Sequence, residues 1–222
     1  MNARAAAEEH LRVIRSLMER ATIYRAISAP TALVGGIAAL LASGYLLWRA
    51  NSGGLTTAAW SREFIVSWLA ALAVTLAANT LFLWRGAAQG QRPFFSPGLR
   101  LAVRAIAPSI LVAAVVSSWV CLQSNFAAPV LLATVWMCLY GLALLATASF
   151  APRSLLILGW CFVVSALSWL FATQLLVGAP SWDVHRHTTV AMALTFGVYH
   201  LVYAACTWAR GRDPQPTQLA SE

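Results

Sequence analysis

Two long apolar runs, separated by a few residues, occupy the middle of the chain. Residues 127–149 read AAPVLLATVWMCLYGLALLATAS, and residues 154–177 read SLLILGWCFVVSALSWLFATQLLV. Neither run contains a charged side chain, and an α-helix needs roughly 20 apolar residues to cross a bilayer core about 30 Å thick. Because the connection Ala151-Pro152-Arg153 is so short, the two runs are predicted to form an antiparallel helical hairpin in a membrane.

Four further apolar runs of similar length flank this hairpin. They cover residues 30–48, 64–84, 105–123 and 188–208. The first begins at Pro30, which suits the first turn of a helix. Trp48 and Trp84 each precede an arginine at the end of a run, as is typical of side chains at a membrane interface. The third run is taken to begin after Arg104, whose long side chain can reach the headgroups from the helix end.

The composition agrees with a membrane protein. The chain has 222 residues, of which 60% are hydrophobic and 10% are charged, and its mean hydropathy is +0.71. Soluble domains carry roughly 25% charged residues. We therefore predict an all-α fold, a polytopic membrane helix bundle with six transmembrane helices within residues 29–209. An amphipathic helix is expected in residues 1–28 and a polar tail in residues 210–222, both of them cytoplasmic.

The arginines indicate the orientation. All 15 basic residues are arginine and none is lysine. When the segments between the runs are assigned alternately to two sides, one side holds twelve arginines and the other holds three, Arg49, Arg62 and Arg186. Since positive residues concentrate on the cytoplasmic side, we predict a multi-pass protein of the bacterial inner membrane with both termini in the cytoplasm. The arginines flank apolar segments instead of forming one basic face, so the lipid bilayer is an expected partner and nucleic acid is not.

The segment before the first run is patterned as an amphipathic helix. Its apolar stripe comprises Leu11, Ile14, Leu17, Met18 and Ala21, with the charged residues on the opposite face. Its i,i+4 ion pairs contribute only about 0.2–0.5 kcal/mol each, so the helix persists only where the stripe is buried. Two readings follow: the helix lies along the inner leaflet, or it docks to a cytosolic protein partner or to a second copy of the chain.

The same segment carries a resemblance. Residues 10–29, HLRVIRSLMERATIYRAISA, run into ALVGG at residues 32–36. This opening resembles that of a family of uncharacterised bacterial multi-pass inner-membrane proteins of about six helices. The resemblance implies a membrane protein of unassigned activity and supplies no catalytic residues.

Catalytic signatures are absent from the sequence. The seven carboxylates are Glu8, Glu9, Glu19, Glu63, Asp183, Asp213 and Glu222, and none lies within an apolar run. This excludes intramembrane aspartyl proteases, magnesium-binding prenyltransferases and most carriers that relay protons through buried carboxylates. HExxH and GxSxG motifs are missing as well. We predict neither an enzyme nor a cofactor.

Polar residues inside the runs are the remaining candidates for a site. Asn79 and His200 lie within predicted spans, and Tyr203 follows His200 by one helical turn. A buried neutral imidazole needs a hydrogen-bond partner. His200 therefore either locks two helices together or lines a small polar pocket for a ligand or a proton.

A second candidate lies before the last run. Asp183, His185 and His187 occupy alternate positions, so an extended strand would turn all three toward one face, as a metal site requires. Arg186 lies among them and no fourth ligand is evident. A solvated loop at the membrane interface is therefore the alternative to a metal site.

Three functions remain open at this level. The first is a non-enzymatic membrane component that binds a partner or associates with itself. The alternative is a small transporter or channel, favoured by polar residues within the runs and disfavoured by the missing carboxylates. The third is a cofactor-binding protein such as a haem carrier, for which His200 is the one histidine within the runs.

Overall fold

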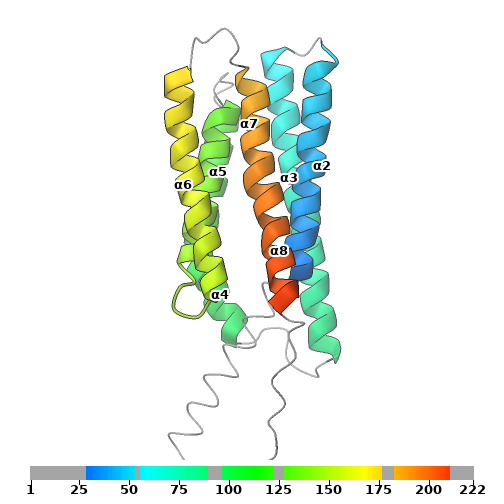
Figure 1. The fold of residues 1–222 in the computed structure, drawn as a ribbon, viewed down its shortest axis with the longest axis vertical. Helices are drawn as coiled ribbons and strands as arrows, with labels where there is room; N and C mark the ends of the chain where they lie inside the picture. Colours follow the sequence, from blue (N-terminus) through cyan, green and yellow to red (C-terminus); the bar gives the residue numbers. More distant parts are fainter. Residues whose placement is uncertain (1–28, 54–55, 90–96, 123–127, 177–182, 211–222) are drawn as a thin grey trace, which may run out of the picture.

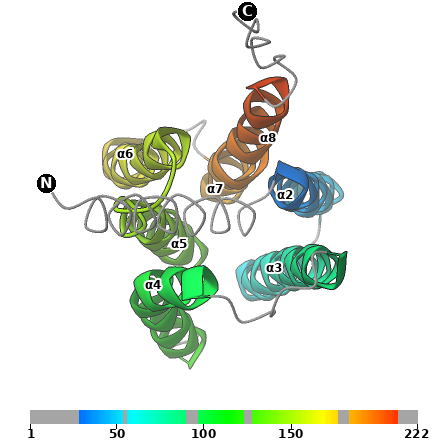
Figure 2. The ribbon, with the colours of Figure 1, turned by 90° about the horizontal axis from the view of Figure 1, so that it is seen from below.

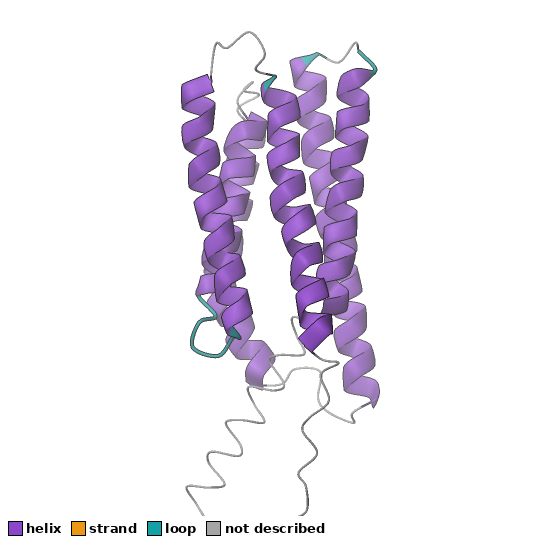
Figure 3. Cartoon of the chain, in the orientation of Figure 1, coloured by secondary structure: helices purple, strands orange, loops and turns teal. Residues whose placement is uncertain are grey.

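The computed structural model describes residues 29–53, 56–89, 97–122, 128–176 and 183–210. Its helices are α2 (Ala29–Asn51), α3 (Thr57–Gln89), α4 (Pro97–Leu122), α5 (Ala128–Leu145), α6 (Arg153–Leu176), α7 (Val184–Met192), the π-helix η1 (Ala193–Val198) and α8 (Tyr199–Arg210). Helices α7, η1 and α8 continue into one another, so the described residues form six helical rods and contain no strand (Figures 1 and 3). The predicted all-helical bundle is confirmed for these residues.

Each predicted apolar run corresponds to one of the six rods. Five rods are long and apolar enough to cross a membrane, and α5 is a shorter apolar helix. The helix ends differ from the ends of the runs. Hydropathy identifies the part of a helix that is apolar enough for the bilayer core, whereas the helix itself ends where its regular backbone hydrogen bonds end. Thus α4 begins at Pro97, which places Arg100, Arg104 and Pro108 inside the helix.

Helix α5 ends four residues before the predicted run does. After Leu145 the chain turns, and the backbone N–H of Phe150 donates to the carbonyl of Thr147 over 3.1 Å. The Thr147 hydroxyl is fully buried and donates to the carbonyl of Leu144 over 2.6 Å. This compact turn leads directly into Arg153 at the start of α6.

Neighbouring rods alternate in direction. Helix α2 packs against α3 and against α7, η1 and α8, while α5 packs between α4 and α6 (Figure 2). The bundle has two ends, which we name after a residue at each. The Glu63 end holds the end of α2 and the starts of α3 and α7, and the Arg153 end holds the α5–α6 turn and the start of α4 (Figure 1).

Glycines allow close contacts between helices. A Cβ built on Gly141 of α5 would lie 2.8 Å from the carbonyl oxygen of Gly159 in α6. A Cβ on Gly197 of η1 would lie 2.6 Å from a methyl group of Leu40 in α2. Small residues at such crossings let two helix backbones approach closely.

Large side chains fill the space between these contacts. The most deeply buried ones are Leu46, Trp60, Phe64, Leu132, Met137, Phe162 and Met192. The outward surface is also apolar, because α3 and α4 bury only a small part of their length. Apolar side chains therefore face both the interior and the surroundings of the bundle.

Candidate functional site

His200 lies in an aromatic part of the core toward the Arg153 end. Its Nε2 is 2.7 Å from the hydroxyl oxygen of Tyr140, which joins α8 to α5. The rings of Tyr140, Phe162 and Phe196 have centroids within 6.3 Å of the imidazole centroid. In this setting the hydrogen bond satisfies one of the two ring nitrogens and fixes the orientation of the ring.

The second nitrogen of His200 has no such partner. Nδ1 is buried and makes no hydrogen bond of acceptable geometry, although the carbonyls of Thr195 and Phe196 lie near the imidazole. If Nε2 accepts the tyrosine proton, Nδ1 carries the hydrogen and is a donor near the carbonyls of Thr195 and Phe196. Such a donor can bind a water molecule, a carbonyl group or another acceptor.

The helix changes its hydrogen-bonding pattern just before His200. Residues Ala193–Val198 form a π-helix, and the N–H of Tyr199 bonds to the carbonyl of Leu194. The widened turn contains Gly197, which packs closely against α2. Single π-helical turns within α-helices are frequent at functional sites.

The other predicted intramembrane residues have different surroundings. Asn79 Oδ1 accepts a hydrogen bond from Thr31 Oγ1 over 3.1 Å, which joins α3 to α2. Tyr203 is buried in the core. The structure thus brings His200 to Tyr140, which the sequence argument did not single out, and places Asn79 in a separate contact. The sequence offers one clue to this contact, since Tyr140 is the one tyrosine in the run 127–149.

Ionic contacts lie at the Glu63 end. Arg49 and Glu63 form a two-pronged ion pair, with Nη2–Oε1 at 2.7 Å and Nε–Oε2 at 3.0 Å. The hydroxyl of Tyr45 donates to the same carboxylate over 3.3 Å. The side chains of Arg49 and Glu63 are 29% and 20% exposed, so the ion pair is partly shielded from solvent. It ties the end of α2 to the start of α3.

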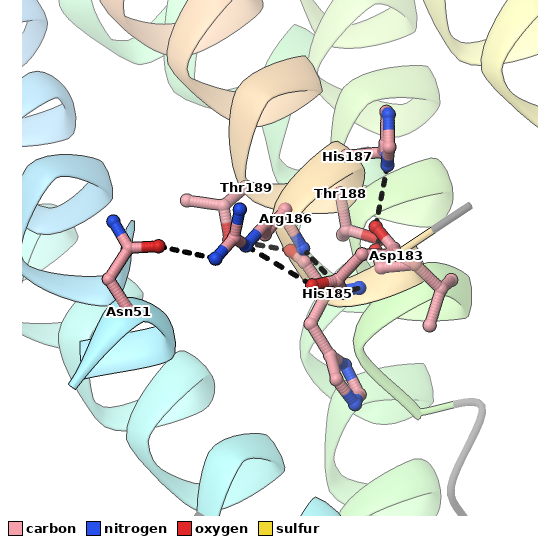
Figure 4. Close-up of polar contacts among 8 residues, drawn as sticks. Asn51, Asp183, His185, Arg186, His187, Thr188 and Thr189 are labelled. Atoms are coloured by element: carbon pink, nitrogen blue, oxygen red, sulfur yellow. Dashed lines mark hydrogen bonds and ion pairs between the residues drawn. The ribbon is translucent and has the colours of Figure 1, made fainter. Parts of the chain in front are cut away.

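The segment Asp183 to His187 is a helix start, so the expectation of an extended or looped segment is wrong. Asp183 is the N-cap of α7, and its Oδ1 accepts from the N–H groups of His185 and Arg186 over 3.0 and 3.2 Å (Figure 4). Aspartate is among the preferred N-cap residues because its carboxylate satisfies free N–H groups of the first turn.

The three candidate metal ligands consequently face different partners. The ring of His185 lies against Trp60, with centroids 4.2 Å apart. Nδ1 of His187 is 2.6 Å from the carbonyl oxygen of Asp183, and Arg186 contacts both the Asp183 carboxylate and Asn51 (Figure 4). Among the residues that the structure describes, no group of three His, Cys, Asp or Glu side chains is placed to hold a metal ion.

Two predicted segments lie outside the described residues. They are the amphipathic segment, residues 1–28, with its stripe Leu11, Ile14, Leu17, Met18 and Ala21, and the tail from residue 211. Comparison of the chain with protein-family models, curated proteins and solved structures finds no match. The functional argument therefore rests on the geometry of the described helices.

Proposed function

We propose that this chain is an integral protein of a bacterial inner membrane that crosses the bilayer six times, with both termini in the cytoplasm. Five long apolar rods support this placement. The sixth, α5, has 18 residues, which at 1.5 Å per residue span about 27 Å, close to the thickness of the hydrocarbon core. In this placement the Arg153 end faces the cytoplasm.

We further propose that the protein acts without catalysis, by associating with a second copy of itself. One observation carries this proposal: the outward face of α3 contains a stripe of three alanines, flanked by larger exposed apolar side chains such as Leu69 and Leu76. Ala70, Ala73 and Ala77 lie on one side of α3 and are exposed. An exposed valine, Val66, and an exposed tryptophan, Trp84, lie at the two ends of the same face.

Contacts inside the bundle support this proposal. Within this chain, α5 and α6 approach each other closely at two small residues, Gly141 and Gly159. Membrane helices associate through packing at small residues, since lipid supplies no hydrophobic driving force between them. A second copy presents the same alanine face, so a two-fold symmetric contact is self-complementary.

The test is to count subunits in lipid vesicles by stepwise photobleaching of a fluorophore attached to each chain. The native protein is expected to give two bleaching steps. The double substitution Ala73→Leu and Ala77→Leu is expected to give mainly one, because leucine side chains keep the backbones apart. Ala205→Leu, at an exposed alanine of α8, is the matched control and should behave like the native protein. A single step from the native protein overturns the proposal.

A second candidate function is the binding of a small polar solute or a proton within the bundle, as in a transporter or channel. The buried Nδ1 of His200, which makes no hydrogen bond of good geometry beside the π-helix, favours it. The test compares His200→Phe with the native protein for proton flux into vesicles and for thermal stability in detergent. If the His200→Phe variant loses proton flux but keeps the thermal stability of the native protein, His200 belongs to a proton pathway. If the native protein shows no flux and the variant is less stable, His200 serves helix packing. A haem-binding function is not carried forward, since His200 is the only histidine in the interior of the described bundle.

A further inference from the structure

Two buried polar groups, one on α2 and one on α3, have no hydrogen-bond partner among the described residues. They are the hydroxyl of Ser43 in α2 and the indole Nε1 of Trp68 in α3. The two residues are 2% and 6% exposed, so bulk solvent does not reach them. Because buried polar groups in native proteins are nearly always hydrogen-bonded, a partner other than the described protein atoms is expected at each.

The alignment of α2 with α3 places these two residues at one level of the bundle. Counted from the ion pair at Glu63, Ser43 lies six residues back along α2 and Trp68 lies five residues forward along α3. Counted from the contact of Gly35 with Thr75, the separations are eight and seven residues. The two helices are antiparallel and rise 1.5 Å per residue, so the levels of Ser43 and Trp68 differ by only about 1.5 Å.

The π-helix η1 is the third element at this level. The ring of Trp68 packs against the ring of Phe196 in η1, with centroids 5.8 Å apart. Leu40 of α2 packs against Gly197 of η1, and Ser43 follows Leu40 by one helical turn. Figure 2 shows α2, α3 and the rod that contains η1 next to one another. The two groups without partners therefore belong to one junction of three helices.

A further donor without a partner lies between this junction and the Glu63 end. Trp60 precedes Trp68 by two turns on the same face of α3, and its Nε1 is buried without a partner among the described residues. Its ring packs against His185 at the start of α7, with centroids 4.2 Å apart. His185 is only partly buried, so this contact leads from the surface at the Glu63 end toward the junction.

The chemistry of the junction selects a small, neutral hydrogen-bond acceptor. An indole N–H can only donate, whereas a serine hydroxyl can donate or accept. Residues 30–48, 64–84 and 187–209 contain no Asp, Glu, Lys or Arg, so an ion at the junction would be buried without a counter-charge, which is strongly unfavourable. Water meets both requirements, since interior water molecules bind buried polar groups that are otherwise without partners.

We propose that the junction of α2, α3 and η1 is an internal water-binding site. The indole N–H of Trp68 donates to a water molecule, which also bonds to the hydroxyl of Ser43, and Trp60 binds water in the same way nearer the Glu63 end. The ring of Phe196 lies between this site and His200, on which it stacks with centroids 6.3 Å apart. The inference rests on the arrangement of the described helices and requires neither of the functions proposed above.

The first test detects water at the indole N–H groups by NMR. Full-length protein with isotope-labelled tryptophan is prepared in deuterated detergent, and cross-peaks between the indole protons and water are recorded. We expect cross-peaks for Trp60 and Trp68. Trp136 is the matched control and should show none, because its Nε1 donates to Ser117 within the protein. The absence of a water cross-peak at Trp68 overturns the proposal.

Phenylalanine substitutions, made one tryptophan at a time, assign the indole signals. Should Trp68→Phe not fold, its signal is assigned by elimination from the other tryptophan variants. A stability test at Ser43 does not depend on this assignment.

The second test asks whether the Ser43 hydroxyl has a partner. If water binds there, Ser43→Ala removes a hydrogen bond and should lower the melting temperature in detergent by about 2–4 °C. In a dry junction the same substitution removes an unsatisfied buried group, which leaves the melting temperature unchanged or raises it. That result would contradict the water site. Ser118→Ala is the matched control and should melt like the native protein, since its hydroxyl is exposed and bonds to the carbonyl of Ala114 in its own helix.

Discussion

The hydroxyl of Tyr140 and Nε2 of His200 are 2.7 Å apart, although the two residues are separated by 60 positions in the chain. They form a polar link between α5 and α8 in a part of the core where the rings of Phe162 and Phe196 also lie. Buried polar groups that lose a partner cost about 1–3 kcal/mol, whereas replacing both partners with apolar groups can be nearly neutral. This asymmetry makes the pair testable by a double-mutant cycle.

We expect Tyr140→Phe to lower the free energy of unfolding by about 1–3 kcal/mol, because Nε2 of His200 is left buried without its partner. The double substitution Tyr140→Phe and His200→Leu should cost less than the sum of the two single substitutions. Thermal or denaturant unfolding in detergent measures all four proteins of the cycle. Additive losses would mean that the hydrogen bond does not couple the two helices.

The second prediction concerns the crossing of α5 and α6. In Gly141→Ala the new methyl group would lie 2.8 Å from a backbone oxygen of Gly159, and overpacking of this kind costs about 1–3 kcal/mol. Gly44→Ala is the control, since a Cβ at that position of α2 has no neighbouring atom within 4 Å. Alanine there should be neutral or stabilising by up to about 1 kcal/mol. Equal melting temperatures for both variants would show that the close crossing is not formed.

Helical segments could be predicted from the sequence because length and uniform apolarity are local properties. The run 154–177 and helix α6, Arg153–Leu176, differ by one residue at each end. The run 64–84 falls short of α3, Thr57–Gln89, because the polar and small residues that flank it are compatible with a helix but not with hydrocarbon. Helix ends in water follow capping and propensity, which an apolarity criterion does not measure.

The site was harder to predict than the helices. His200 was singled out because an imidazole in an apolar run needs a partner, but the identity of that partner depends on how α5 and α8 align, which one sequence does not specify. The start of α7 at Asp183 was missed for a different reason. Alternating Asp and His residues suggested a strand, while the N-cap preference of aspartate, also visible in the sequence, determines the local structure.

A third prediction tests the ion pair that ties α2 to α3. Glu63→Gln removes the negative charge but keeps the shape of the side chain, so Arg49 loses its two charge-assisted hydrogen bonds. We expect the Glu63→Gln variant to have a lower melting temperature in detergent than the native protein. This difference in melting temperature should be smaller at high salt, because salt already screens the partly exposed pair in the native protein. Arg62→Gln, which removes a neighbouring exposed arginine, should leave the melting temperature unchanged. A Glu63→Gln variant as stable as the native protein would show that the pair contributes nothing.

The last prediction concerns orientation. Helix α2 begins and α8 ends at the Arg153 end of the bundle, so six crossings place both termini on one side of the membrane. Reporter fusions after residues 92 and 212 should report the cytoplasm, and fusions after residues 56, 125 and 182 the periplasm, because positively charged segments are retained in the cytoplasm. The fusion after residue 125 is the most informative, since it follows α4, whose first turns carry Arg100 and Arg104. A cytoplasmic signal there, with the other fusions unchanged, would mean that α4 and one of the two helices α5 and α6 do not cross the membrane, and that the bundle has four crossings instead of six.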